Sequence, residues 1–439
     1  MMVGMLAAMS TAPVPPSSQA TAVSRDRGDA CPGTLKLHEA DDGALARVRV
    51  PGGVLSTAQA RALSAIARRL GDGELHLTSR GNVQLRGLRA GCGAELAAAL
   101  AGAGLLPSPE HERVRNVVAS PLSGLDGRGV RELRPWLTAL DAALCASPAA
   151  RALSGRFLFA LDDGRGDMAA LGADVTVRAV SGGAGDALIA AGAADRALRI
   201  AGDDAPRAAL LIAEAFLRRV RESGARVWRI AELDLPPGES LRWVRGTLAD
   251  HGIGSVPERW PDGPYETGAP PPGITGSALC VQAPLGRLTA AQWQEATDAA
   301  EGELRLTPWR GLVVPVPGLS AAAASAALGG LARTGLVTDP ASPWLRTGAC
   351  IGRPGCAKSR SDVRADAIRG LAAAGRSRLP LYWSGCERRC GRPPGDRIDV
   401  VAAPDGGYRL TGTAAGQPPR TASLDHPDQL AGALAAITP

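Results

Sequence analysis

Four cysteines near the end of the chain carry the clearest chemical signal in the sequence. Cys350 and Cys356 form a C-x5-C pair in GACIGRPGC, and Cys386 and Cys390 form a C-x3-C pair in SGCERRC. Clustered thiols in a protein that is not secreted typically bind metal. Zinc sites usually place paired ligands about two to four residues apart, which fits only the second pair. An iron–sulfur cluster takes thiolates from more widely separated corners. The spacing therefore favours a cluster, with zinc and unligated thiols as alternatives.

The positive charge of the chain comes almost entirely from arginine. The sequence has 49 Lys and Arg residues against 43 Asp and Glu residues, and Lys36 and Lys358 are its only lysines. An arginine bias is typical of a GC-rich genome, but guanidinium groups also bind carboxylates bidentately and stay charged when partly buried. The arginines are dispersed and no aromatic stacking set accompanies them, so we expect a polyanion pocket and no nucleic acid partner.

The composition is typical of a soluble globular protein with two or three domains. Of the 439 residues, 45% are hydrophobic and 21% are charged. No window reaches the roughly 18 consecutive apolar residues of a membrane span. The first residues lack the basic leading segment of a signal peptide. We therefore expect a cytoplasmic protein without a membrane partner and with a flexible N-terminal extension.

An internal repeat organises most of the chain. Residues 45–88 and 278–319 each read as a strand, a Pro-containing turn, a Ser or Thr that begins an Ala-rich helix, the tripeptide Gly-Glu-Leu, and two further strands. A second helix follows each copy, which completes most of a ferredoxin-like unit. Because another segment follows each copy, the sequence predicts a duplicated pair of modules with an active site between the halves. One chain then supplies the whole site, and we expect a monomer.

The predicted fold class is α+β, with two ferredoxin-like half-domains that are each followed by an α/β module. A Pro/Gly-rich stretch, PDGPYETGAPPPGITG, separates the halves and has the composition of a linker. The expected parts are a flexible extension (1–34), the first half-domain (35–108), the first α/β module (109–260), the linker (261–276), the second half-domain (277–340) and the four-cysteine module (341–439).

Four motifs together resemble those of the sulfite and nitrite reductase superfamily. The two cysteine pairs are similar to its [4Fe–4S] signature, and LTSRGNVQLRGL (77–88) resembles its Thr-x-Arg-x-x-x-Gln strand. RVRNVVASPLSG (113–124) resembles its Arg-Asn-Val segment, and LSGRFLFALDDG (153–164) resembles its basic-Phe loop. The duplicated half-domains are similar to its architecture as well, so the resemblance implies that fold for nearly the whole chain beyond the extension.

The resemblance also implies a tetrapyrrole beside the cluster. Members of the superfamily carry siroheme, which has eight carboxylates and is coupled to the cluster through the last cysteine, here Cys390. Several fixed arginines suit such a polyanion because they do not titrate. The cluster ligands would be Cys350, Cys356, Cys386 and Cys390. By position in the motifs, the tetrapyrrole-binding residues would be Arg80, Gln84, Arg115, Asn116 and Arg156.

One position departs from the pattern of the reductases. Sulfite reductases typically have Lys-x-Lys in the third motif, where this chain has Arg156 and Leu158. A leucine cannot donate a proton or offer charge to a small anion during its reduction. In this respect the chain resembles the precorrin-3B synthase branch, whose members act on a tetrapyrrole instead of holding one as cofactor. A siroheme-dependent sulfite or nitrite reductase is the first alternative. The second is a non-catalytic binding protein that is stabilised by zinc.

The precorrin-3B synthase branch implies an oxidoreductase of aerobic cobalamin biosynthesis. Its reaction is a monooxygenase step, in which O2 hydroxylates C20 of precorrin-3A and an acetate side chain closes to a γ-lactone. The implied cofactors are a [4Fe–4S] cluster and a mononuclear non-heme iron. The segment SGGAGDALIAAG does not fit the G-x-G-x-x-G fingerprint, so electrons would come from a separate reductase or ferredoxin. Candidate groups for the iron are His38 and His76 by their imidazoles, and Asp162 or Asp163.

Overall fold

The computed structural model describes residue 29 and residues 31–181, 185–192, 195–236, 238–261, 268–393 and 395–437. Most of the predicted N-terminal extension lies outside the described residues, and so does the part of the predicted linker from 262 to 267. From Cys31 onward the chain forms one compact unit. No helix within the described ranges is long and apolar enough to cross a membrane.

The two sequence repeats form two sheets that exchange one short strand each. The elements of the first repeat are β1 (Ala44–Val48), β2 (Val54–Ser56), α1 (Thr57–Leu70), β3 (Leu75–Leu77), β4 (Val83–Leu88) and α2 (Gly93–Gly102). Those of the second are β11 (Gly273–Thr275), β12 (Ala278–Gln282), β13 (Arg287–Leu288), α6 (Ala290–Ala299), β14 (Glu303–Leu306), β15 (Gly311–Pro315) and α7 (Ala321–Arg333). The strand orders are β1-β4-β3-β13 and β11-β12-β15-β14-β2. Because β13 pairs with β3 and β2 pairs with β14, each half-domain completes the sheet of the other.

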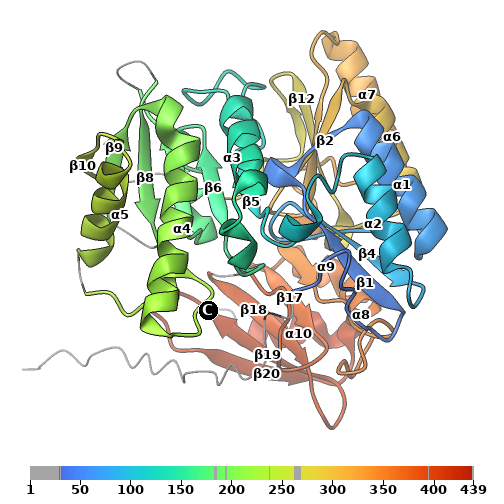
Figure 1. Cartoon of the computed structure of the whole chain (residues 1–439). Coiled ribbons are helices and arrows are strands. Elements are labelled where there is room, and N and C mark those ends of the chain that lie inside the picture. The colour runs from blue at the N-terminus through green and yellow to red at the C-terminus, as the bar shows by residue number, and fades with distance from the viewer. Residues whose placement is uncertain are drawn as a thin grey trace, which may run out of the picture. The chain divides into compact units, whose positions relative to one another are not determined.

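The first helix of each repeat begins with the same capping motif. The Ser56 hydroxyl accepts a hydrogen bond from the Gln59 amide at 3.1 Å, and the Thr289 hydroxyl accepts one from the Gln292 amide at 3.2 Å. Both glutamine side chains bond back to the cap, which satisfies amides that a helix start leaves unpaired. The four helices pack in the order α2, α1, α6, α7 (Figure 1). The buried Trp293 indole joins the middle pair by donating to the Ala60 carbonyl at 2.8 Å.

Each half-domain is followed by an α/β module with the same strand plan. The first module has β5 (Val117–Ala119), α3 (Arg134–Ala146), β6 (Phe159–Asp162), β7 (Val175–Ala179), β8 (Ala187–Ala191), β9 (Arg196–Ile200), α4 (Ala205–Ser223), α5 (Glu239–Asp250) and β10 (Val256–Arg259). The second has β16 (Thr347–Ala349), α8 (Val363–Arg369), α9 (Leu371–Ala374), β17 (Leu381–Ser384), β18 (Arg397–Ala402), β19 (Tyr408–Thr413), β20 (Arg420–Leu424) and α10 (Leu430–Ile437).

The two modules share their sheet topology. In each, the first three strands run parallel and the next two are antiparallel, in the orders β10-β9-β8-β7-β6-β5 and β16-β17-β18-β19-β20. Helices α3, α4 and α5 cover one face of the first sheet (Figure 1). The α+β class and the duplicated architecture are therefore confirmed. The domain boundaries given above stay predictions.

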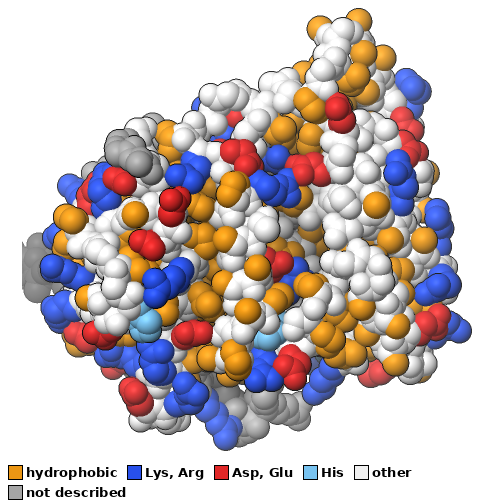
Figure 2. Space-filling model, turned by 45° about the horizontal axis from the view of Figure 1, so that its top comes forward, with side chains coloured by type: hydrophobic (Ala, Val, Ile, Leu, Met, Phe, Trp, Pro, Cys, Tyr) orange, Lys and Arg blue, Asp and Glu red, His pale blue; other side chains and the backbone are white. Residues whose placement is uncertain are grey.

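The surface agrees with the dispersed arginines of the sequence. On the face shown in Figure 2, basic side chains are scattered and interspersed with acidic ones. Many arginines are in ion pairs, such as Arg61 with Asp298 at 3.1 Å.

Candidate functional site

A large cavity lies where all four modules meet. Its volume is about 950 Å³, which is at the upper end of the range for ligand pockets. The first half-domain contributes Ser79 and Arg80, and the first module contributes Leu158. The second half-domain adds the segments 282–286 and 308–310, and the four-cysteine module adds the ends of β16 and β17 together with Gly391 and Arg392. The cavity therefore depends on both halves of the duplicated chain.

The lining of this cavity is apolar with strong positive charge. Among the described residues that line it, none is acidic, and the apolar part includes Trp309, Trp344 and several leucines and prolines. Five arginines line it, namely Arg80, Arg229, Arg310, Arg346 and Arg392. An apolar wall with several guanidinium groups suits a broad ligand that has an apolar body and carboxylates at its edge.

Arg80 is held in place by backbone carbonyls and keeps donors for a ligand. Its guanidinium donates to the Gly155 carbonyl at 3.1 Å and to the Arg156 carbonyl at 2.9 Å. A guanidinium has five N–H donors, so these two bonds leave others available. Burial and, to a smaller extent, nearby Arg229 lower the pKa of Arg80 to about 10. The side chain therefore stays charged at neutral pH.

Arg310 is the counterpart of Arg80 in the second repeat. LTSRG (77–81) and LTPWRG (306–311) align with one extra residue in the second copy, and both arginines line the cavity. Arg310 donates to the Gly391 carbonyl at 3.0 Å, directly after Cys390. The sequence analysis missed this residue, although the internal repeat would have pointed to it. Arg346 directly precedes β16, as Asn116 directly precedes β5 in the first module, so the duplication could have pointed to it as well. Arg229 and Arg392 lie outside the motifs and had no such signal.

The other arginines predicted to bind the tetrapyrrole do not line the cavity. Arg115 is buried and donates to both carboxylate oxygens of Asp141 at 2.7 Å. The guanidinium of Arg156 lies over the ring of Trp228, 4.7 Å from its centre. Both side chains therefore have partners within the protein. Their contact with a substrate stays a prediction.

The two uncharged residues predicted to bind the tetrapyrrole, Asn116 and Gln84, also have hydrogen-bond partners within the protein. Asn116 donates to the Gly155 carbonyl at 3.0 Å, the same carbonyl that Arg80 contacts, so these residues converge on one turn. Gln84 lies on β4 opposite His76 and accepts from Arg47 at 3.5 Å. Neither residue lines the cavity. Asn116 therefore holds the carbonyl that in turn positions Arg80.

The four cysteines lie in two loops at one end of the second module. Cys350 follows β16, Cys386 and Cys390 follow β17, and all four cysteines are free thiols. The Gly385 amide donates to Cys350 Sγ at 3.3 Å. Ala349 and Gly391, the neighbours of Cys350 and Cys390, line the cavity.

Close packing of glycine shapes the cysteine loops. A Cβ at Gly385 would lie 1.7 Å from the Ser359 hydroxyl oxygen, so only glycine fits between the two loops. Burial raises the pKa of the Cys350 thiol, and the nearby thiols of Cys390 and Cys386 add to this rise. A metal cluster reverses the effect because it binds thiolates. Three neighbouring thiols, Cys350, Cys386 and Cys390, with a backbone amide aimed at one sulfur fit an iron–sulfur cluster, for which Cys356 would be the fourth ligand.

The first module has a place that corresponds to the cysteine loops of the second. The Ser120 amide donates to the Leu161 carbonyl at 3.1 Å, and the Cys350 amide donates to the Trp383 carbonyl at 2.9 Å. The Asp163 amide donates to the Ser120 hydroxyl at 3.1 Å, just as Gly385 donates to the Cys350 sulfur. Ser120 is therefore the counterpart of Cys350 in the duplicated fold.

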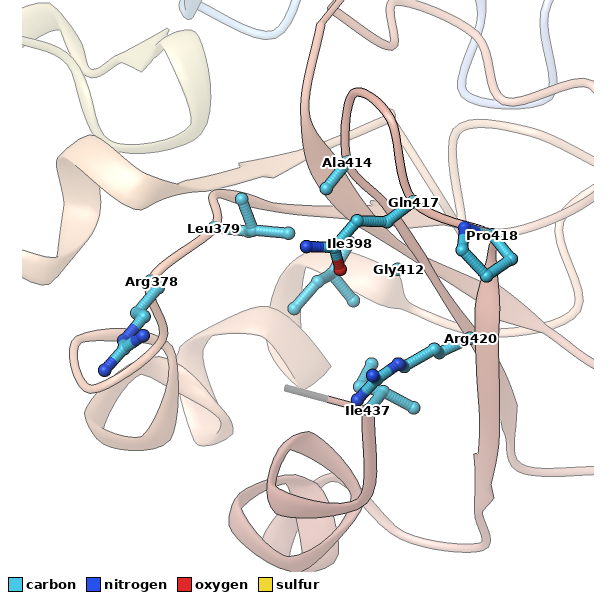
Figure 3. A pocket seen from close by; sticks show the side chains of 9 residues that line it. All are labelled: Arg378, Leu379, Ile398, Gly412, Ala414, Gln417, Pro418, Arg420 and Ile437. Carbon is cyan, nitrogen blue, oxygen red and sulfur yellow. The ribbon is translucent and has the colours of Figure 1, made fainter. Parts of the chain in front are cut away.

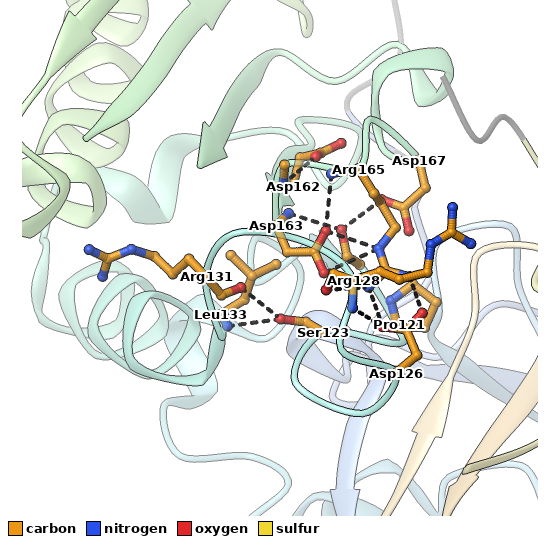
Figure 4. Close-up of polar contacts among 12 residues, drawn as sticks. Pro121, Ser123, Asp126, Arg128, Arg131, Leu133, Asp162, Asp163, Arg165 and Asp167 are labelled. Atoms are coloured by element: carbon orange, nitrogen blue, oxygen red, sulfur yellow. Dashed lines mark hydrogen bonds and ion pairs between the residues drawn. The ribbon is translucent and has the colours of Figure 1, made fainter. Parts of the chain in front are cut away.

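Acidic residues fill that place with ion pairs and backbone contacts. Figure 4 shows Arg165 between Asp163 and Asp126, at 2.8 and 2.9 Å. Asp162 accepts hydrogen bonds from three backbone amides of the same loop. Asp162 and Asp163 thus hold the loop together, and their contacts do not support the hypothesis that they bind iron or move protons.

A second, smaller cavity lies on the four-cysteine module beside β18, β19 and the end of α10 (Figure 3). Its volume is about 130 Å³, which is too small for a macrocycle. Arg378 and Arg420 lie on either side of the apolar Ile398. It has no cysteine in its lining and no direct connection to the chemistry described above.

Comparisons with known proteins agree with this architecture. Residues 38–103 and 273–329 match the nitrite/sulfite reductase ferredoxin-like half domain, which confirms the duplication. The NirA protein of Mycobacterium tuberculosis has the same fold, with a TM-score of 0.66 at 18% identity over 89% of this chain and 79% of that one. The two matched segments are therefore nitrite/sulfite reductase ferredoxin-like half domains, and the chain has the fold of a sulfite/nitrite reductase. Its curated relatives are enzymes, which supports an oxidoreductase.

Two curated relatives are similar over most of their length. A precorrin-3B synthase from Sinorhizobium sp is 28% identical over 425 residues, which are 93% of this chain and 88% of the relative. A ferredoxin–nitrite reductase from Synechococcus elongatus is 25% identical over 82% of this chain and 76% of the relative. The two names correspond to the two activities that the sequence left open.

Proposed function

We propose that the protein is a precorrin-3B synthase, which hydroxylates C20 of precorrin-3A with O2 and closes the γ-lactone in aerobic cobalamin biosynthesis. The observation that carries the proposal is the arginine-lined cavity of about 950 Å³ that adjoins the loops of Cys350 and Cys390. Precorrin-3A is a macrocycle with eight carboxylates. A pocket with five arginines and no acidic residue among its described lining offers the matching charge.

In this proposal, the paired arginines of the repeat hold opposite edges of the substrate. Arg80 and Arg310 occupy equivalent places in the two half-domains, so they can bind two carboxylates from two sides. Arg229, Arg346 and Arg392 are further carboxylate ligands. Asn116 and the backbone of Arg156 then position Arg80. Contact of Arg115, Gln84 and Arg156 with the substrate stays a prediction.

Cys350, Cys356, Cys386 and Cys390 would hold a [4Fe–4S] cluster at the edge of the cavity. Such a cluster supplies electrons one at a time. A monooxygenase places one atom of O2 on the substrate and releases the other as water, which consumes two electrons and two protons. These electrons would come from a separate reductase or ferredoxin that draws on a reduced nicotinamide. We propose that one chain carries out the reaction as a monomer.

Leu158 favours this proposal over a siroheme-dependent reductase. Its side chain lines the cavity and is 3% exposed. Sulfite reductases typically place a lysine there, and a buried leucine offers neither charge nor protons to sulfite or nitrite. The same arginines could hold siroheme, so the reductase stays the alternative.

The absorption spectrum of protein purified without oxygen separates the two functions. Iron and acid-labile sulfide are counted on the same sample. The proposal predicts a broad cluster band, about four iron and four sulfide per chain at least, and no sharp tetrapyrrole bands. Intense tetrapyrrole bands that persist through purification would establish siroheme and overturn the proposal. Zinc without sulfide would instead favour a binding protein without redox chemistry.

A further inference from the structure

A group of one imidazole and two carboxylates lies on the first half-domain, outside the cysteine loops. Asp72, Glu74 and His76 follow one another at every second residue, on and just before β3. Glu74 and His76 alternate along the extended chain and so point to the same side, and a bend at Gly73 brings Asp72 to them. One ligand atom from each of the three side chains lies within 4.8 Å of the others.

His76 is the unusual member of this group. The residue is 7% exposed, and neither of its ring nitrogens has a hydrogen-bond partner. Its Nε2 atom lies 4.0 Å from Asp72 Oδ2 and 3.8 Å from Glu74 Oε2. A buried polar group without a partner is unfavourable, so the imidazole points at the two carboxylates without bonding to them.

We propose that Asp72, Glu74 and His76 bind a divalent transition-metal ion. An ion equidistant from the three atoms would lie about 2.3–2.5 Å from each, so small side-chain shifts would bring them to the usual bond lengths of about 2.0–2.2 Å. Imidazole with carboxylates suits iron, manganese or zinc. Two carboxylates balance the charge of the ion, and three protein ligands leave coordination positions open.

The surroundings support a metal ligand at each position. Arg287 on β13 donates to Glu74 Oε2 at 2.5 Å from the other half-domain, and such outer contacts commonly fix a ligating carboxylate. The Asp72 carboxylate also accepts from the Glu74 amide at 2.9 Å.

Arg287, which contacts Glu74, connects the site to the substrate cavity along the chain. Leu285 and Gly286, which precede Arg287, line the cavity, and Arg364 donates to the Cys350 carbonyl at 3.3 Å. Asp72, Glu74 and His76 do not line the cavity themselves, so the metal site does not depend on the proposed function.

Mn²⁺ binding to the whole, cluster-loaded protein tests the site. Free Mn²⁺ is followed by its paramagnetic resonance signal during a titration, with wild type, His76→Gln and Asp72→Asn compared. The matched controls are His251→Gln, a histidine that bonds to the Thr247 carbonyl at 2.9 Å, and Asp298→Asn, an exposed carboxylate paired with Arg61. Asp72 is exposed, so its variant should fold even where His76→Gln does not.

We expect one Mn²⁺ per chain in wild type and in both controls, with at least about tenfold weaker binding in the two ligand variants. Absence of binding to wild type overturns the proposal, and so does undiminished affinity in Asp72→Asn or in a folded His76→Gln. The measurement needs no tetrapyrrole. Bound Mn²⁺ without hydroxylation would contradict the proposed function alone, and hydroxylation without this Mn²⁺ site would contradict the metal site alone.

Discussion

Replacing Arg80 by glutamine should weaken tetrapyrrole binding more than it weakens the fold. Two donors of the Arg80 guanidinium are used by the carbonyls of Gly155 and Arg156, which leaves further donors on a residue that lines the cavity. A hydrogen bond to a charged group contributes about 1.5–3 kcal/mol. Its loss corresponds to an increase in Kd of about 10- to 150-fold.

The cost of the same change to stability should be small. The Gly155 carbonyl keeps its bond from Asn116 at 3.0 Å, so only the Arg156 carbonyl loses a donor. We expect the free energy of unfolding to fall by about 1 kcal/mol. A large drop in affinity with a small drop in stability would separate a ligand contact from a structural one.

Fluorescence quenching of an octacarboxylate porphyrin, uroporphyrin III, measures the affinity directly. The titration is run without oxygen at two salt concentrations, because contacts between charges weaken with ionic strength. Arg61→Gln is the control, since Arg61 is exposed and paired with Asp298. Arg310→Gln should behave like Arg80→Gln. An unchanged Kd in Arg80→Gln would refute the assignment of this residue to the carboxylates.

Three further variants test the rest of the site. Cys386→Ser should lose acid-labile sulfide, cluster absorption and turnover together, and full sulfide content would contradict the ligand assignment. Arg165→Ala leaves the carboxylates of Asp163 and Asp126 buried without their cation. The free energy of unfolding, measured in urea, should therefore drop by about 3–5 kcal/mol. A loss below about 1 kcal/mol would refute the structural role of Arg165. Burial raises the pKa of Asp167 to about 7, so between pH about 4 and 7 the folded state keeps a proton that the unfolded state has lost, and stability falls as the pH rises. Asp167→Asn should remove this slope, and an equal slope in urea unfolding from pH 5 to 8 would contradict it.

The local parts of the fold could be predicted from the sequence because their signals are local. The same capping motif appears at Ser56 with Gln59 and at Thr289 with Gln292, and the strand alternation around it repeats as well. The exchange of β2 and β13 between the sheets could not be predicted in this way. It depends on which edges meet in space, and short strands of two or three residues carry little pattern of their own.

The residues of the candidate site could be predicted from the sequence only in part, for a similar reason. Motif positions gave Arg80, which lines the cavity, but they also gave Arg115, whose charge is matched by Asp141 from a helix 26 residues further along the chain. A motif records residue types and not their partners. Arg310 could be predicted from the repeat, whereas Arg229 lies outside both the motifs and the repeat.

The measurement that tests the central claim most directly is turnover of precorrin-3A under ¹⁸O2. The cluster-loaded protein is mixed with precorrin-3A, a chemical or enzymatic reductant and the labelled gas, and the tetrapyrrole is analysed by mass spectrometry. A precorrin-3B synthase should produce one new tetrapyrrole that carries a single ¹⁸O atom, and the yield should fall in Arg80→Gln and vanish in Cys386→Ser. Unchanged precorrin-3A, together with reduction of sulfite or nitrite by the same preparation, would contradict the claim.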